Sequence, residues 1–210
     1  MTIICTTMCS DKQIDGSVIL RALRALGEIL SSQGKRISIV AVGGVAMILQ
    51  GFVQRTTHDL DIIAFGRAPG NRKPTMIDPP DPVPEWLSLA ISRVARDFGL
   101  PGDWMNMVVG AQWDLGLPPG FTKRIHWERY GGLWFGVADR YDLIMLKLYA
   151  AVDSKGLSSV HFQDLIALKP NEHELKEAVD WVRSQDTSPD FARMLDQVVE
   201  HARREIKSNI

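Results

Sequence analysis

The sequence is short of cysteine and of long apolar runs, and each shortage excludes a class of protein. Only 2 of its 210 residues are cysteines, Cys5 and Cys9. Two thiols with no second pair can neither complete a zinc site nor cross-link a small secreted domain. No apolar run approaches the roughly 18 residues of a membrane helix. The first ten residues lack the charged start and apolar core of a secretory signal. We therefore expect a cytoplasmic protein with no membrane partner.

The sequence also has no excess of charge of either sign. Its 24 basic and 25 acidic side chains give a formal net charge of −1. No global field therefore draws the protein to nucleic acid, and any RNA contact would be a local patch. A hydrophobic content of 45% in 210 residues is enough for an ordinary globular core.

The strongest chemical signal lies in the segment 37–65. An apolar run typical of a buried strand ends at Gly43 and Gly44, which allow a sharp turn and a close approach of the backbone to a ligand. Asp59 and Asp61 are one residue apart, so an extended strand places both carboxylates on one face, with Cα atoms about 7 Å apart. Repulsion should raise the pKa of at least one of them. Carboxylate oxygens of this kind suit Mg²⁺ that also binds substrate phosphates.

Each of these features has an ordinary structural alternative. Gly43 and Gly44 fit a simple tight turn, and Asp59 and Asp61 fit caps or ion pairs at a strand edge. The two features in this order favour a nucleoside triphosphate site with a divalent cation.

A second signal is a lysine within an apolar helical stripe. Asp139 is a typical N-cap for a helix that runs to about Val152. Lys147 lies within or beside the stripe that the helix should bury, which is formed by Leu143, Leu146 and Ala150. A lysine there either extends to solvent or meets an anion in a cleft. Asp164, on the next short helical segment, either orients Lys147 and shapes a nucleotide pocket or is an ordinary charge near a helix start.

These motifs together resemble the polymerase-β-like nucleotidyltransferase superfamily. Gly43-Gly44 followed by the segment 55–61 (RTTHDLD) is similar to its glycine pair and metal-binding D-x-D pair. The segments 143–150 (LIMLKLYA) and 161–165 (HFQDL) resemble the third and fourth motifs of the AbiEii-type branch, which includes toxin-like enzymes of bacterial toxin–antitoxin systems. The resemblance covers about residues 35–185.

The resemblance implies transfer of a nucleotidyl group from an NTP to a hydroxyl of RNA or of a protein, with Mg²⁺ or Mn²⁺ as cofactor. A partner protein from a neighbouring gene is also implied. Asp59 and Asp61 would hold the metal and, with Lys147, form the catalytic set. The implied nucleotide-binding residues are Gly43, Gly44, Arg55, Lys147 and Asp164.

Three departures from the family pattern leave alternatives open. The serine that often follows the glycine pair is Val45 here, and His161 replaces an aspartate. A third carboxylate has no clear counterpart, although Asp114 and Glu128 are candidates. One alternative is a non-catalytic nucleotide-binding or regulatory module. Another is an antitoxin-like enzyme that nucleotidylates a neighbouring toxin.

The predicted fold class is α/β, more narrowly α+β with a mixed sheet. Residues 1–138 would form a nucleotidyltransferase-like core, with residues 1–13 frayed and the segment 68–84, which holds six prolines, as an irregular surface loop. Residues 139–210 would form a helical part packed on the core. Further expected elements are helices over 18–30, 85–98 and 190–206, a hairpin at Gly131-Gly132, and a helix with an Asn171–Glu174 capping box.

Overall fold

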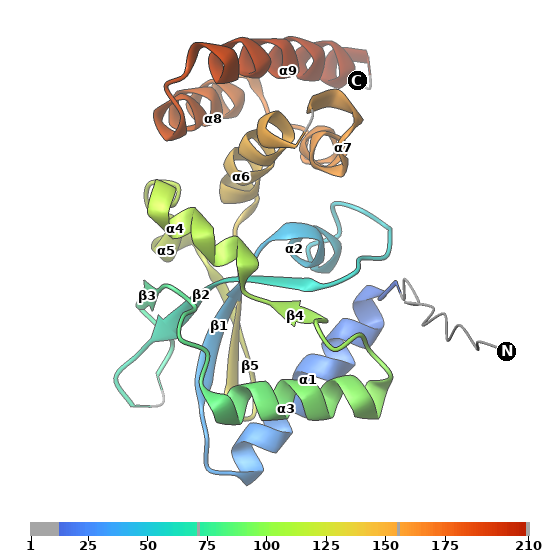
Figure 1. Ribbon diagram of the computed structural model, residues 1–210, viewed down its shortest axis with the longest axis vertical. Coiled ribbons are helices and arrows are strands. Elements are labelled where there is room, and N and C mark those ends of the chain that lie inside the picture. The colour runs from blue at the N-terminus through green and yellow to red at the C-terminus, as the bar shows by residue number, and fades with distance from the viewer. Residues whose placement is uncertain (1–12, 71, 155, 209–210) are drawn as a thin grey trace, which may run out of the picture.

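The computed structural model describes residues 13–70, 72–154 and 156–208 (Figure 1). The expectations for Cys5, Cys9 and a frayed start concern residues 1–12, which lie outside this description. The described residues form a mixed α/β structure around a 6-stranded sheet with the order β3-β2-β1-β6-β5, in which β4 pairs with β2 off this path. The strands are β1 (Ile37–Ala41), β2 (Leu60–Arg67), β3 (Met76–Asp78), β4 (Met105–Asn106), β5 (His126–Tyr130) and β6 (Leu133–Val137).

The central strand β1 is buried on both faces, which explains its continuous apolar run. It pairs in parallel with β6 and antiparallel with β2. Ile39 packs in one hydrophobic cluster with α1 (Gly16–Ser32) and α3 (Glu85–Phe98), and Val40 packs in a second cluster that continues into the C-terminal helices. Successive side chains of a strand point to opposite faces, so β1 joins the two halves of the core.

Local signals in the sequence set several element ends as predicted. The predicted hairpin is confirmed, because β5 and β6 pair antiparallel and Tyr130 lies opposite Leu133. The turn between them contains Gly131, which has φ +55°. The helix expected over 85–98 is α3, and it ends at Gly99 with φ +62°. A left-handed residue at this place is the usual glycine C-cap.

The expectation of an irregular segment over 68–84 was partly wrong. Met76–Asp78 form β3, a short edge strand whose Asp78 lies opposite Phe65 of β2. The prolines on both sides of β3 made a strand difficult to predict, because proline disfavours central strands. Proline is tolerated around a short edge strand such as β3.

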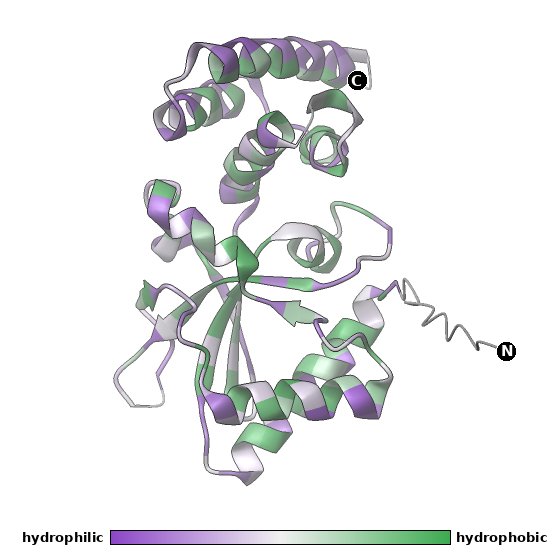
Figure 2. Cartoon of the chain, in the orientation of Figure 1, coloured by the Kyte–Doolittle hydropathy of each residue, from purple (hydrophilic) through white to green (hydrophobic). Residues whose placement is uncertain are grey.

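The chain after Ala138 is helical (Figure 1). Its helices are α6 (Arg140–Asp153), α7 (Val160–Ala167), α8 (Glu172–Gln185) and α9 (Pro189–Ser208), with a 3₁₀ turn η2 (Gly156–Ser158) between α6 and α7. Figure 2 shows apolar residues on the side of α9 that faces the other helices and polar residues on its outer side. The Asp139 N-cap and the Asn171–Glu174 capping box are both confirmed. Among the described residues, no helix is both apolar and long enough to span a lipid bilayer.

A single buried residue links the sheet to these helices. The Ala138 N–H donates to the carbonyl of Ala41 at 3.0 Å, and its carbonyl accepts from Gln50 Nε2 at 2.9 Å. The Asp139 carboxylate then accepts from the backbone N–H of Tyr141 and begins α6. The link is therefore held on both sides before the first helical turn.

Arg140 fixes the start of α6 to the following helices. Its guanidinium donates to the carbonyl oxygens of Leu168 and Lys169 at 3.0 and 2.9 Å, and to both carboxylate oxygens of Glu174 at 2.6 and 3.1 Å. The hydrogen bonds from Arg140 are the largest cause that lowers the pKa of Glu174.

This ion pair predicts a pH-dependent loss of stability in Glu174→Gln. The substitution should lower the free energy of unfolding by about 1.5 kcal/mol at pH 7, because charge-assisted hydrogen bonds are lost. A carboxyl with a lowered folded pKa stabilises above its unfolded pKa, so the difference from the unmodified protein should shrink as the pH falls below about 4. Urea unfolding at both pH values measures it. The exposed Glu205→Gln is the control, and an equal loss in that variant would contradict the assignment.

Candidate active site

The two aspartates of the D-x-D pair lie at the start of β2. Asp59 immediately precedes the strand and Asp61 is its second residue, while Leu60 between them is fully buried. Burial raises the pKa of both carboxyls. Repulsion from Asp103 raises the pKa of Asp59 further, and repulsion from Asp59 raises that of Asp61, which Lys147 opposes. The expected direction is therefore confirmed, although burial is a larger cause than repulsion.

The Asp61 carboxylate packs directly against the glycine pair. Gly43 has φ +68°, and a Cβ atom built on it would lie 2.0 Å from Asp61 Oδ2. A Cβ on Gly44 would lie 2.9 Å from Thr57 Oγ1. The turn into α2 (Gly43–Leu49) therefore requires glycine at position 43 for two reasons. The positive φ angle favours glycine, and the Asp61 carboxylate occupies the space that a side chain would need.

Lys147 and Arg55 share one buried carboxylate. Lys147 Nζ lies 2.7 Å from Asp164 Oδ2, and the Arg55 guanidinium donates to both Asp164 oxygens at 3.0 and 2.9 Å. The side chains of Lys147 and Asp164 are only 5% and 2% exposed. Two cations and one anion leave a formal surplus of one positive charge. Of the two alternatives for Lys147, extension to solvent was wrong, and Asp164 orients the lysine.

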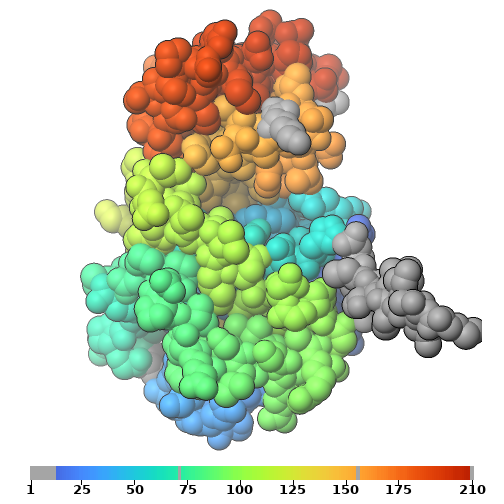
Figure 3. Space-filling model, viewed as in Figure 1, coloured from blue at the N-terminus to red at the C-terminus, as the bar shows by residue number. Residues whose placement is uncertain are grey.

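A cleft of about 720 Å³ brings these groups together. In Figure 3 the surface is hollowed where orange atoms of the C-terminal helices meet the green and cyan atoms below them. Gly43, Asp59, Asp61 and Lys147 all line the cleft, although they are far apart in the sequence. Gly44, Arg55 and Asp164 do not line the cleft, but Gly44 follows Gly43 in the chain, and Asp164 contacts both Lys147 and Arg55. The other lining residues are Val42, Asp103, Asn106, Val108, Val109, Gln112, Leu143, Leu146, Tyr149, Ala150, Asp153, Ser154 and His161.

The apolar stripe of α6 is placed differently from the prediction. Leu143 is fully buried, but Leu146 and Ala150 are only half-buried and form part of the cleft wall. Helix α6 is covered on most of its circumference, and the residues buried in it are Asp142, Leu143, Ile144, Met145, Lys147, Leu148, Ala151 and Val152. Lys147 is buried for this reason, which a one-sided stripe does not predict.

Neither candidate for a third carboxylate reaches the aspartate pair. Asp114 lies in α4 (Gln112–Leu115) outside the cleft, and Glu128 lies in β5, where it accepts a hydrogen bond from Tyr130. The cleft instead contains Asp103, which precedes the short strand β4, and Asn106, which is the second residue of β4.

His161 lines the cleft as a neutral side chain. Burial lowers its pKa and the Lys147 ammonium lowers it further, so the ring is uncharged at neutral pH. Its Nδ1 atom is buried and has no hydrogen-bond partner among the described residues. The position that the resemblance expects to be an aspartate therefore adds no negative charge next to Lys147.

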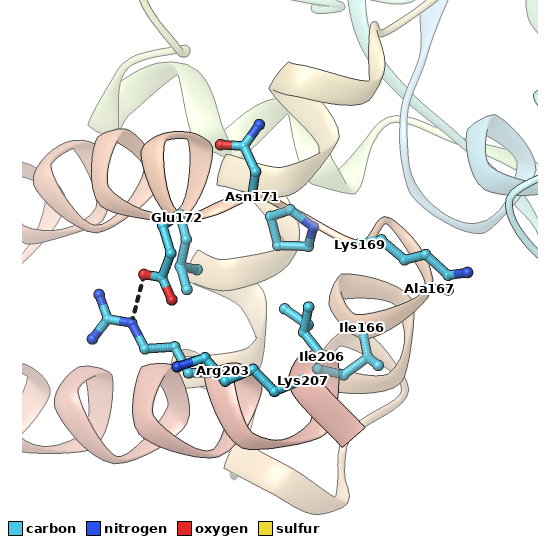
Figure 4. A pocket seen from close by; sticks show the side chains of 10 residues that line it. Ile166, Ala167, Lys169, Asn171, Glu172, Arg203, Ile206 and Lys207 are labelled. Carbon is cyan, nitrogen blue, oxygen red and sulfur yellow. Dashed lines mark hydrogen bonds and ion pairs between the residues drawn. The ribbon is translucent and has the colours of Figure 1, made fainter. Parts of the chain in front are cut away.

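A second cavity, of about 650 Å³, lies between α7, α8 and α9 (Figure 4). Ile166 and Ile206 supply apolar walls, and an ion pair of 3.0 Å joins Arg203 to Glu172 at one side. None of the predicted site residues lines it, so the cleft that contains Asp61 is the better candidate for an active site.

Comparison with protein families agrees with this geometry. Residues 19–180 match the model of a family described as "nucleotidyltransferase of unknown function (DUF6036)". The chain belongs to this family. No curated protein and no solved structure gives a significant match to the chain. The matched range includes every predicted site residue of this nucleotidyltransferase family member, from Gly43 to Asp164.

The carboxylate pair of this family member suits a divalent cation bound together with a substrate. Asp59 and Asp61 offer oxygen ligands side by side, as Mg²⁺ prefers. Among the described residues, no group of three or more His, Cys, Asp or Glu side chains gathers to hold a metal. Phosphate oxygens and water would have to complete the coordination, which is usual for Mg²⁺ at nucleotide sites.

The buried pair of Lys147 and Asp164 predicts a large loss of stability in Asp164→Ala. The variant should lose about 3 kcal/mol of unfolding free energy, because it leaves the Lys147 ammonium buried without its carboxylate. The double variant Lys147→Met, Asp164→Leu should regain most of the loss, because both buried charges are gone. Urea unfolding measures both. A loss below about 1 kcal/mol in the single variant would mean that the lysine finds another partner or solvent.

Proposed function

We propose that the protein is a Mg²⁺-dependent nucleotidyltransferase of the AbiEii type, which transfers a nucleotidyl group from an NTP to a hydroxyl of RNA or of a protein. The observation that carries the proposal is the common cleft of Gly43, Asp59, Asp61 and Lys147. Mn²⁺ is expected to replace Mg²⁺, because both prefer carboxylate and water ligands.

In this proposal each of these residues has a separate task. Asp59 and Asp61 would hold the cation, which would neutralise triphosphate charge. Gly43 and Gly44 let Asp61 and Thr57 pack closely against the turn into α2, and the backbone N–H groups that follow the glycines would hold the phosphates. Lys147 stabilises the negative charge that develops on the departing pyrophosphate. Asp164 and Arg55 hold the lysine in place, and Arg55 adds positive charge behind it.

The proposed reaction forms one bond and breaks one. The oxygen of the acceptor hydroxyl attacks the α-phosphorus, the bond from this phosphorus to the bridging oxygen breaks, and the electron pair leaves with pyrophosphate. The hydroxyl proton is released to solvent at the open side of the cleft. The apolar residues Val109, Leu143 and Leu146 offer a wall for the base of the nucleotide.

Two observations favour a second candidate function, that of a nucleotide-binding module without chemistry. The position next to Asp61 on β4 is Asn106 rather than a carboxylate, and Val45 supplies no hydroxyl after the glycines. The enzyme is the better-supported function because a binding module has no need for a lysine buried beside a carboxylate pair. The proposal also includes the identity of the acceptor. The acceptor decides between a toxin role and an antitoxin role, and it includes a possible partner protein from a neighbouring gene.

Nucleotide binding should require both the cation and the aspartates. At an NTP concentration about 100 times Kd, the melting temperature should rise by about 5 °C with Mg²⁺ and hardly at all without it. Asp61→Asn keeps the shape of the side chain but removes the charge, so it should abolish the shift. Asp114→Asn, a carboxylate outside the cleft, is the matched control and should keep it. A shift that persists in Asp59→Ala and Asp61→Ala would place the nucleotide elsewhere.

Transfer and binding should respond differently to Lys147→Met, which keeps most of the packing volume. With labelled NTPs, Mg²⁺ and total RNA or candidate proteins, the variant should transfer label about 100-fold more slowly, because the lysine acts mainly on the developing charge. Its affinity for NTP should fall less than about tenfold. Equal losses would assign Lys147 to binding alone. Label transferred at the full rate by the Asp59→Ala, Asp61→Ala double variant would refute the mechanism.

A further inference from the structure

Asn106 is a neutral side chain that contacts both aspartates. Strands β2 and β4 pair in parallel, with Asp61 opposite Asn106. Asn106 Nδ2 donates to Asp59 Oδ2 at 2.6 Å and lies 3.5 Å from Asp61 Oδ1. One amide therefore lies between the two carboxylates that would hold the cation.

A backbone hydrogen bond fixes the direction of this amide. The N–H of Val108 donates to Asn106 Oδ1 at 3.2 Å. The oxygen of the side chain is thus turned toward the backbone of η1 (Val108–Ala111), and its NH₂ group is turned toward the carboxylates. This assignment follows from the hydrogen-bond network, because an amide oxygen facing the carboxylates would be repelled and Val108 would lose its acceptor. In this orientation Asn106 offers no oxygen to a cation.

The amide changes the charge available to cations. Asp59 and Asp61 together carry a formal charge of −2, which one divalent cation balances. Asp103 also lines the cleft and its charge acts on Asp59, but among the described residues it does not gather with the pair into a three-carboxylate group. A carboxylate in place of Asn106 would bring a further negative group directly between Asp59 and Asp61, with oxygens free to bind a second cation. The amide instead occupies one oxygen of Asp59 as a hydrogen-bond acceptor, so fewer carboxylate oxygens remain for metal.

We infer that Asn106 restricts this site to one divalent cation for each bound nucleotide. The inference rests on the proposed function and names a positioning residue rather than a catalytic one. It follows that activation of the acceptor hydroxyl does not depend on a second cation held by this chain. Replacing the amide NH₂ by a carboxylate oxygen, in Asn106→Asp, should then create a site for two cations.

The test counts ions rather than activity. The purified protein is dialysed against Mn²⁺ and a non-hydrolysable α,β-methylene analogue of ATP, and the Mn²⁺ and nucleotide retained by the protein are both measured. The unmodified protein should retain about one Mn²⁺ for each nucleotide, and Asn106→Asp should retain about two, as in two-metal sites. The electron paramagnetic resonance spectrum of Asn106→Asp should also show coupling between two Mn²⁺ ions, which a merely structural change would not produce.

The controls separate this inference from the proposed function. Asn106→Ser stays neutral and should keep the ratio at about one. Failure of the unmodified protein to retain Mn²⁺ with the nucleotide, or retention that survives Asp61→Asn, would contradict the proposed function itself. A ratio of about two Mn²⁺ for each nucleotide in the unmodified protein would overturn only the role of Asn106. This measurement uses the unmodified protein, so it does not depend on whether a variant folds. A ratio of about one in a folded Asn106→Asp would overturn this role as well.

Discussion

The cleft depends on the Asp164 carboxylate, which two cations share. Asp164 lies in α7, Lys147 in α6 and Arg55 in the loop before β2, so this contact ties the helices to the sheet. A buried carboxylate is tolerated only when its charge is compensated, and a buried ammonium likewise. Removing one of these groups alone therefore leaves another buried without its counter-charge. Lys147 lines the same cleft as the aspartate pair, and its positive charge opposes the rise in the pKa of Asp61.

Much of the fold could be predicted from local signals, because these do not depend on distant residues. Asp139 and Asn171 satisfy free backbone groups within their own helices, and Gly131 turns a hairpin between neighbouring strands. The short strands β3 and β4 could not be predicted. They consist of 3 and 2 residues, and only their pairing with β2 makes them strands. The strand order was equally out of reach, because it is decided by tertiary packing.

The site divides in the same way. Side chains alternate along a strand, so Asp59-Leu60-Asp61 alone predicts that both carboxylates lie on one face. The glycine pair likewise predicts a sharp backbone turn. Lys147 was noticed because a charge within an apolar stripe needs a partner, but the partner and the depth of burial come from covering helices. Asp103 carries no local signal, and Asn106 reads from the sequence either as polar support for the site or as a helix-end residue. They reach the site because β4 pairs with β2, and their chemistry appears only when the register brings Asn106 beside Asp61.

The fixed link at Ala138 means that a small tilt of α6 would move the residues at its far end, including Lys147 in the cleft wall. The carbonyl of Ala41 and the side chain of Gln50 hold both backbone groups of Ala138, so a tilt of α6 against the sheet would pivot near Asp139. Lys147 lies eight residues further along α6, which at the rise of an α-helix is about 12 Å from this pivot. A tilt of about 5° there would carry the ammonium about 1 Å along an arc. A tilt too small to disturb the helix packing is thus enough to make or break a hydrogen bond at Lys147.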